Sequence, residues 1–265
     1  MERYPKLPLE TEQLRDLTDK AKDWAVCHGL VMRKKERRQH SDEVRVAPIS
    51  LLPSPFPAPY YQQAIHIQPD MNLLYFRAAY DYDFIADSLK SVVKTDEFTR
   101  RLLDIYTTVH GEGLAQPLVL QIQRSDYMAH ENEDGQYSLK QIEVNNIASS
   151  FAGLAARVSE MHRYILHELG VQFHNDHQEN HVLLANKGLD TVAEGLALAY
   201  RDFESQVATN AIILHVVEEE SQNIADQRLV EYAVLEKTAG AGKSLRLTLA
   251  QCHRQLHLDP TTKRL

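Results

Sequence analysis

Residues 137–146 read YSLKQIEVNN and predict the strand around which the rest of the fold is arranged. Side chains alternate along a strand, so residues two apart point to the same face. Ile142 and Val144 therefore share one face, which we expect to be buried, and Glu143 and Asn145 share the other. Carboxylate and amide oxygens are hard ligands that suit Mg2+. By itself, the stretch fits either a solvated strand face or a cation site.

The residues before this strand predict a partner strand and a turn. The run LVLQIQ (118–123) is apolar enough for a buried strand, and NEDGQ (132–136) supplies the Asp-Gly chemistry of a tight turn. We therefore expect a β-hairpin that pairs 118–123 with 137–146.

The polar residues next to these strands point to an anion. Arg124 directly follows the first predicted strand, and its guanidinium can fork onto a carboxylate or a phosphate. Ser149 and Ser150 precede a predicted helix at 153–169, and a hydroxyl-rich turn before a helix N-terminus is suited to binding anions. A cation pair, an arginine and such a turn indicate a phosphoryl or acyl-phosphate site.

Helical periodicity accounts for much of the remaining chain. Apolar residues at helical spacing predict helices at 11–29, 60–79, 81–93, 95–112, 190–204 and 223–237. The face of the first is expected to hold Leu14, Leu17, Ala21 and Trp24. For the helix at 95–112, Thr95 is the expected cap, and the buried stripe is expected to contain Phe98, Leu102, Ile105 and Val109.

The C-terminal region predicts a strand, a helix and a second strand. The apolar run AIILHVV (211–217) is followed by the helix at 223–237 and by LRLTLA (245–250). This order is typical of a βαβ unit with two parallel strands, so the fold class is α/β. The proline-rich segment 48–59 is expected to be a packed, extended connector.

Composition limits the classes of partner and compartment. The chain has 265 residues and a net charge of −8, which disfavours nucleic acid and anionic membranes as main partners. Its two cysteines are far apart, its first residues contain no apolar run, and no window approaches 18 apolar residues. We expect a cytoplasmic protein with no membrane span.

Two further motifs have simpler interpretations than a ligand site. TAGAGKS (238–244) has lysine, not glycine, where a phosphate-binding loop begins, and it follows a helix instead of a strand, so a glycine-rich turn is the better interpretation. HNDHQENH (174–181) would place His177 and His181 one helical turn apart and able to share a metal ion. A solvated loop is the simpler alternative for that segment.

Three ordered motifs resemble eukaryotic glutathione synthetase: QRSDYM (123–128), LKQIEVNNIASSFAGLA (139–155) and NIADQR (223–228). The resemblance extends in order over essentially the whole chain. It implies a ligase that joins glycine to γ-glutamylcysteine with ATP through an acyl phosphate. It also implies a circularly permuted ATP-grasp fold, usually as a homodimer. Residues 1–206 would belong to the N-terminal portion of the ATP-grasp region, and 207–265 to the start of a substrate-binding α/β domain.

The resemblance assigns roles to individual positions. Glu143 and Asn145 match magnesium ligands, and Ile142 and Glu143 match residues beside the nucleotide. Positions that match substrate-binding residues are Arg124, Ile147, Ala148, Ser149, Ser150, Ser221, Gln222, Asn223 and Gln227. No catalytic residue is assigned.

The chain also departs from the family pattern. Asn146 and Ala148 stand where the family typically has Thr and Ser, and Ser221-Gln222 replaces Glu-Arg. The chain resembles only the first half of the family sequence. The other half is implied to carry the glycine-rich loop over ATP, the nucleotide-gripping lysines and the glycine-binding arginine, so this chain alone is not expected to turn over. The alternative hypothesis is a non-catalytic short form that acts as a dimerisation or regulatory partner of the full enzyme.

Overall fold

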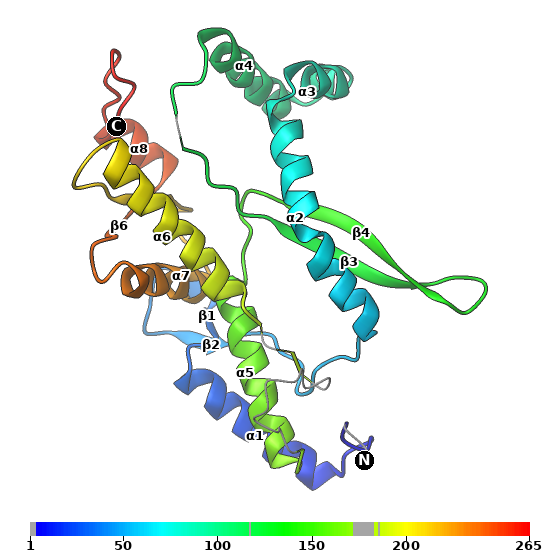
Figure 1. Ribbon diagram of the computed structural model, residues 1–265. Coiled ribbons are helices and arrows are strands. Elements are labelled where there is room, and N and C mark those ends of the chain that lie inside the picture. The colour runs from blue at the N-terminus through cyan, green and yellow to red at the C-terminus, as the bar shows by residue number, and fades with distance from the viewer. Residues whose placement is uncertain (1–3, 117, 172–182, 185) are drawn as a thin grey trace. The chain divides into compact units, whose positions relative to one another are not determined.

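The computed structural model describes residues 4–116, 118–171, 183–184 and 186–265, which form two compact units (Figure 1). Unit 1 contains the described residues up to Pro55, those of 148–259, and Leu265. Unit 2 contains Phe56–Ile147 and Pro260–Arg264, apart from residue 117. No helix in the described part of the chain is long and apolar enough to cross a bilayer.

Unit 1 is a mixed α/β structure with its core between two helices. Its helices are α1 (Thr11–Cys27), η1 (Lys35–Arg37), α5 (Ala152–Glu168), α6 (Gly188–Gln206), α7 (Ile224–Lys237) and α8 (Leu249–Gln255). Strands β1 (Val31–Arg33) and β2 (Val44–Val46) pair antiparallel, while β5 (Ile213–Val216) and β6 (Ser244–Leu247) pair parallel. The βαβ prediction is therefore confirmed in β5–α7–β6.

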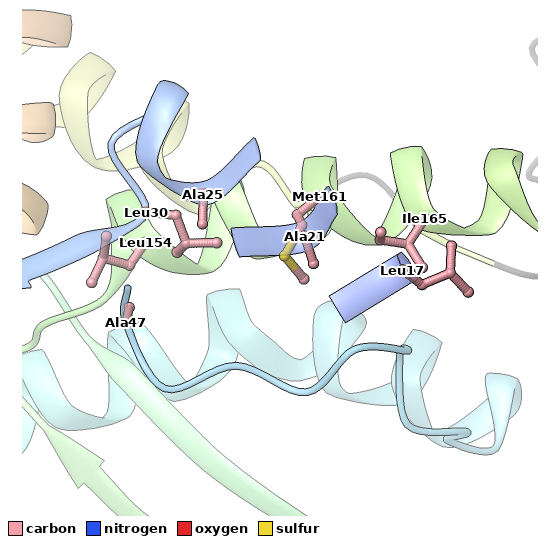
Figure 2. Close-up of a cluster of buried hydrophobic side chains, with 8 residues drawn as sticks. All are labelled: Leu17, Ala21, Ala25, Leu30, Ala47, Leu154, Met161 and Ile165. Atoms are coloured by element: carbon pink, nitrogen blue, oxygen red, sulfur yellow. The ribbon is translucent and has the colours of Figure 1, made fainter. Parts of the chain in front are cut away.

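The core of unit 1 forms where α1 packs on α5 (Figure 2). Leu17, Ala21 and Ala25 are spaced four residues apart and line one side of α1. Met161 and Ile165, both with no exposed surface, line α5. The predicted face of the first helix is shifted, because Ala25 is buried whereas the side of the helix that carries Leu14 is exposed. Alanine at two of these positions lets the two helices approach closely.

The end of the second parallel strand differs from the prediction. The run 245–250 does not continue as a strand, because Thr248 begins α8 with a capping box. Its hydroxyl accepts a hydrogen bond from the Gln251 N–H at 3.1 Å, and the Gln251 side chain accepts one from the Thr248 N–H at 2.8 Å. This reciprocal capping stabilises a helix start over a further strand residue.

Unit 2 contains a helical segment and a hairpin. The helices are α2 (Ala58–Tyr80), α3 (Tyr82–Leu89), η2 (Val92–Lys94) and α4 (Glu97–Glu112), and the strands are β3 (Arg124–Glu131) and β4 (Tyr137–Asn145). The hairpin is confirmed, but its first strand is β3 and not the apolar run 118–123. The reason is the turn: Asn132 accepts from the Gly135 N–H at 2.9 Å and donates to the Gln136 carbonyl at 2.8 Å. That tight turn places the residues directly before it opposite β4.

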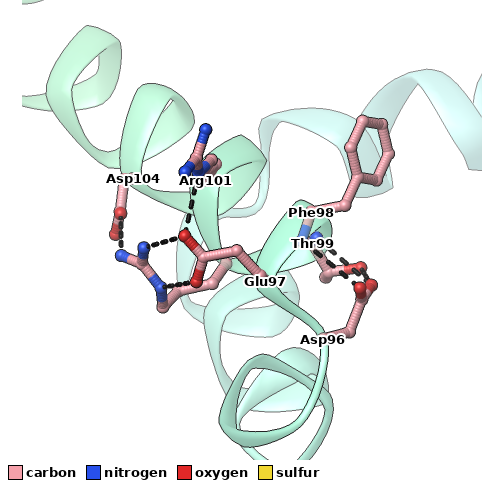
Figure 3. Close-up of polar contacts among 7 residues, drawn as sticks. Asp96, Glu97, Phe98, Thr99, Arg101 and Asp104 are labelled. Carbon is pink, nitrogen blue, oxygen red and sulfur yellow. Dashed lines mark hydrogen bonds and ion pairs between the residues drawn. The ribbon is translucent and has the colours of Figure 1, made fainter.

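The N-terminus of α4 is capped by Asp96 and not by Thr95 (Figure 3). Its carboxylate accepts hydrogen bonds from the N–H groups of Phe98 at 3.3 Å and Thr99 at 3.2 Å. The stripe predicted to be buried on this helix is exposed, with Ile105 at 62%. No described residue of unit 2 packs closely enough over it to bury any α4 side chain.

The stability of unit 1 is expected to fall as the pH is lowered. His162 on α5 is buried and bonds the Ser50 carbonyl at 2.9 Å, and burial lowers its pKa. Burial also lowers the pKa of His215. Unfolding lets each ring regain its ordinary pKa of about 6.5, so the unfolded chain binds more protons below that value. The stabilising contribution is therefore present above about pH 6.5 and is lost as the pH falls through the lower folded pKa.

The measurement uses Trp24, the only tryptophan of the chain, which packs on the core of unit 1. The midpoint of urea unfolding, followed by its fluorescence, should fall between neutral and mildly acidic pH. The midpoint is the quantity to read, because the His28 ring stacks on Trp24 with centroids 3.9 Å apart and can quench its fluorescence. His162→Gln should flatten the profile, and an unchanged profile in that variant would contradict the assignment.

Candidate functional site

A polar cluster lies on one face of the β3–β4 hairpin in unit 2. Arg124 pairs across the strands with Asn145, and Asp126 pairs with Glu143. The Arg124 guanidinium holds the Asp126 carboxylate through two bonds, Nε to Oδ1 at 2.9 Å and Nη2 to Oδ2 at 3.1 Å. It also lies 3.8 Å from Glu143 Oε1. The structure thus brings together the three residues that the sequence proposed here and adds Asp126.

The charges of the cluster are only partly balanced. Two carboxylates directly opposite each other repel, and this repulsion needs compensation. The hydrogen bond from Arg124 lowers the pKa of Asp126, and the same bond raises the pKa of Arg124. The Asn145 amide donates to Glu143 at 2.9 Å and to Asp126 at 3.4 Å. One guanidinium faces two carboxylates, so the cluster retains a negative charge that attracts a cation.

A β-bulge sets the position of Ile142. Asp126 is paired with Glu143 and Tyr127 with Gln141, so Ile142 is the extra residue without a partner across the hairpin. The expectation that Ile142 is buried is wrong, because it is 59% exposed. Its exposure leaves an apolar side chain on the surface at the residue before Glu143. Bulges often re-aim side chains beside functional sites.

The donor set of the cluster suits a hard cation. Among the described residues, no three His, Cys, Asp or Glu side chains are grouped to hold a metal ion. Two carboxylates and one amide would thus leave coordination positions to phosphate and water, as Mg2+ usually requires. The Asn145 amide currently presents its NH2 group to the carboxylates. To offer its oxygen to a cation, the amide would have to turn by half a rotation about its last torsion.

A strained turn precedes α5 in unit 1. Ala148 has φ 53° and Phe151 has φ 76°, both in the left-handed region that disfavours non-glycine residues. Ser150 bonds back to the Ala148 carbonyl through its N–H at 2.8 Å and its hydroxyl at 3.3 Å. Strained backbone of this kind is often retained at functional sites. Ile147, the residue before the turn, belongs to unit 2 and is 88% exposed.

The second predicted substrate-binding segment lies at the start of α7, also in unit 1. The Ser221 hydroxyl accepts hydrogen bonds from the Asn223 N–H at 3.2 Å and the Gln227 amide at 3.1 Å. Two buried polar atoms in this segment have no hydrogen-bond partner among the described residues: Gln222 Nε2 and Asn223 Oδ1. Buried polar atoms normally find partners, so these two are available to a ligand or to water.

Asp226 joins the strained turn to this segment. Its carboxylate accepts hydrogen bonds from the N–H groups of Phe151 at 2.7 Å, Gly153 at 2.9 Å and Leu154 at 2.9 Å. It also accepts one from the Asn223 amide at 3.3 Å. The structure therefore gathers the predicted residues into a hairpin cluster in unit 2 and a turn-and-helix corner in unit 1. The histidine segment 174–181, weighed as a metal site, lies outside the described residues.

Sequence reasoning missed two acidic residues of these groups. Asp126 lies two residues after Arg124, and strand alternation would have placed it on the same face once the strand was located at 124–131. Asp226 lies in the first turn of α7, but the backbone N–H groups that it binds at the start of α5 are more than 70 positions earlier in the chain. No local pattern in the sequence indicates that contact.

Comparisons with known proteins agree on one relationship. Residues 11–263 match the family model described as the eukaryotic glutathione synthase ATP-binding domain. Glutathione synthetase of Rattus norvegicus is 38% identical over 228 residues, covering 86% of this chain and 46% of the relative. Glutathione synthetase of Xenopus laevis is 37% identical over 250 residues, covering 94% and 50%.

A solved structure is similar as well. It is that of a glutathione synthetase-like effector from Globodera pallida in its apo form, with a TM-score of 0.76 and 30% identity. The similarity covers 96% of this chain and 54% of that one. The present chain spans about half the length of the relatives it matches.

Proposed function

Because this chain belongs to the eukaryotic glutathione synthetase family, we propose that it supplies part of the nucleotide and dipeptide sites of an ATP-dependent ligase. The reaction would join γ-glutamylcysteine to glycine through an acyl phosphate. The observation that carries the proposal is the β3–β4 cluster, where Arg124, Glu143 and Asn145 meet on one face, as a magnesium-nucleotide site requires. The complete fold would be a circularly permuted ATP-grasp.

In unit 2, the proposed roles follow from charge and exposure. Glu143 and Asn145 would hold Mg2+, which would neutralise phosphate charge when bound. The exposed Ile142 would contact the nucleotide beside Glu143. Arg124 would bind an anionic group of the substrate, with Asp126 fixing its guanidinium in place.

In unit 1, the two segments would bind γ-glutamylcysteine. The proposed residues of unit 1 are Ala148, Ser149, Ser150, Ser221, Gln222, Asn223 and Gln227. Ile147, the last residue of this part of unit 2, is proposed as well. The unpartnered Gln222 Nε2 and Asn223 Oδ1 support this proposal, because a zwitterionic γ-glutamyl group offers both acceptors and donors. Ala148 lacks the hydroxyl that the family typically has here, so one hydrogen bond to the substrate would be absent.

Further proposals rest on the family resemblance alone. They are a cytoplasmic homodimer and a domain boundary near residue 207 of the complete fold. The negative net charge supports the absence of a nucleic-acid partner.

Glu143→Gln should weaken the binding of Mg-ATP to this chain by about tenfold to a hundredfold, because one charge-assisted interaction is lost. Titration calorimetry with Mg-ATP measures the affinity, and ATP with chelator tests its dependence on magnesium. Glu131→Gln is the matched control, since Glu131 is an exposed carboxylate at the other end of β3. Equal affinities for the two variants, or binding that does not depend on magnesium, would contradict the proposed function.

A further inference from the structure

We propose that Asp226 is a positioning residue, which holds the 148–151 turn in its binding conformation and fixes it to the Ser221–Gln227 segment. The inference rests on the proposed function, since both segments are assigned there to γ-glutamylcysteine. Asp226 itself need not touch the substrate. It acts through the backbone that carries the substrate-binding groups.

The first observation is the number of N–H groups that one buried carboxylate satisfies. Asp226 is 3% exposed, and its Oδ1 accepts from Gly153 and Leu154 while its Oδ2 accepts from Phe151. The first N–H groups of a helix have no partner within the helix. Phe151, the residue before α5, offers no side-chain cap. Asp226 of α7 therefore caps α5 from a distant part of the chain, and its charge is favourable at the positive end of the α5 dipole.

The second observation is the strain that this cap holds in place. Phe151 adopts φ 76° and ψ 16°, a conformation that costs free energy for a side chain with a Cβ atom. Its N–H bond to Asp226, at 2.7 Å, is the shortest of the three and fixes the strained residue directly. The neighbouring Ser149 and Ser150 are therefore presented by a turn whose geometry depends on Asp226.

The third observation is the close contact between α5 and α7. A Cβ atom added to Gly153 would lie 2.9 Å from Leu229 Cβ and 3.2 Å from the Asp226 carbonyl oxygen. The absence of a side chain at position 153 is what allows α5 and α7 to approach this closely. Asp226 Oδ2 also accepts from the Asn223 amide, so one oxygen atom links Asn223 to Phe151. A displacement of the turn must therefore be transmitted to the start of α7.

The test compares Asp226→Asn with Thr238→Val. Asparagine can keep one acceptor toward Gly153 and Leu154, but it turns an NH2 group toward the Phe151 N–H. Thr238 lies at the opposite end of α7, is 9% exposed, and its hydroxyl accepts from the Gly242 N–H at 2.9 Å. Valine removes that acceptor at nearly constant volume. Both variants thus leave one backbone N–H group without its side-chain acceptor, but only the first alters the turn.

The affinity for γ-glutamylcysteine, measured by titration calorimetry on the whole chain, should fall by about tenfold or more in Asp226→Asn, as expected for misplaced hydrogen bonds to a charged ligand. In Thr238→Val, the affinity should stay within about twofold of that of the unchanged chain, which is a small difference in binding free energy. Amide hydrogen exchange should accelerate at both Ser150–Leu154 and Gln222–Asn223 in the first variant only. Equal affinities and equal exchange in the two variants would overturn the inference.

Testing Asp226→Asn together with a second substitution distinguishes a local effect on the turn from a general loss of folding. Glycine adopts positive φ without strain, so Phe151→Gly should reduce the dependence of the turn on its cap. The loss of affinity caused by Asp226→Asn should then be smaller in the Phe151→Gly background, and an equal loss would contradict positioning through Phe151. If the unchanged chain binds no γ-glutamylcysteine, the proposed function fails, while the exchange comparison still decides whether Asp226 holds the turn.

Discussion

Replacing Glu231 by alanine is expected to lower the free energy of unfolding of unit 1 by about 3–5 kcal/mol, the usual cost of removing one partner from a buried ion pair. Glu231 is 4% exposed and lies on α7. One of its oxygens is 2.6 Å from Arg228, and the other pairs with Arg246 of β6, whose side chain is only 14% exposed. Alanine would leave the buried Arg246 guanidinium without this carboxylate, while its hydrogen bond to the Gln227 amide oxygen would remain.

Glu97→Ala is the control for this change. Glu97 also pairs with two arginines, Arg100 and Arg101 (Figure 3), but its side chain on α4 is 58% exposed. Water already solvates those charges, so the stability of the chain should hardly change. Urea unfolding followed by Trp24 fluorescence and by circular dichroism measures both variants. A loss as small for Glu231→Ala as for Glu97→Ala would show that burial does not make this pair costly to break.

A double variant separates the cost of leaving one buried charge unpaired from the loss of the attraction between Glu231 and Arg246. Replacing a whole buried pair by apolar residues of similar volume is often neutral, because no charge is left unpaired. Glu231→Leu combined with Arg246→Met should therefore recover much of the stability that Glu231→Ala loses. No recovery would indicate that the network is required for packing between α7 and β6.

Ile165→Ala is expected to lower the free energy of unfolding of unit 1 by about 2–5 kcal/mol, since it leaves a cavity in a closely packed core. Ile165 has no exposed surface and lies among Leu17 and Met161 between α1 and α5 (Figure 2). Trp24 packs against this cluster, so its fluorescence reports the loss directly.

The matched control is Ile105→Ala, the same chemical change in the middle of another helix. Ile105 is 62% exposed on α4, so no cavity forms and alanine favours the helix slightly. The unfolding midpoint of Ile105→Ala should stay close to that of the unchanged chain. The two variants should therefore differ by most of the shift that Ile165→Ala causes. Similar midpoints would mean that the α1–α5 contact is not the main core of unit 1.

Several parts of the fold follow from local sequence rules. Periodicity places α1, α5 and α6 close to their observed bounds, and the order of elements identifies the parallel β5–α7–β6 unit. The Asp-Gly turn identifies the hairpin. The first strand of that hairpin was misplaced, because apolar character suggested 118–123 while the turn selects the polar residues next to it. Register depends on the turn geometry, which overrides the hydrophobic pattern here.

The candidate site was also only partly predictable from local sequence rules. Alternation along β4 was sufficient to place Glu143 and Asn145 on one face, and the position of Arg124 at the end of the neighbouring predicted strand put it near them. The strand bulge that exposes Ile142 was not predicted, because it arises from a pairing between two strands and not from either strand alone.

What the sequence by itself determined is most of the helices and which residues share a face of a strand or helix, because these depend on spacing between near neighbours. The resemblance of three ordered motifs added the family. The tertiary structure alone decided what covers each face. Ile105 and Ile165 both lie on apolar stripes, yet one is exposed and the other has no contact with solvent. It also decided that Asp226 caps a helix whose first residues lie more than 70 positions away. Such contacts depend on packing between distant segments, and no local spacing encodes them.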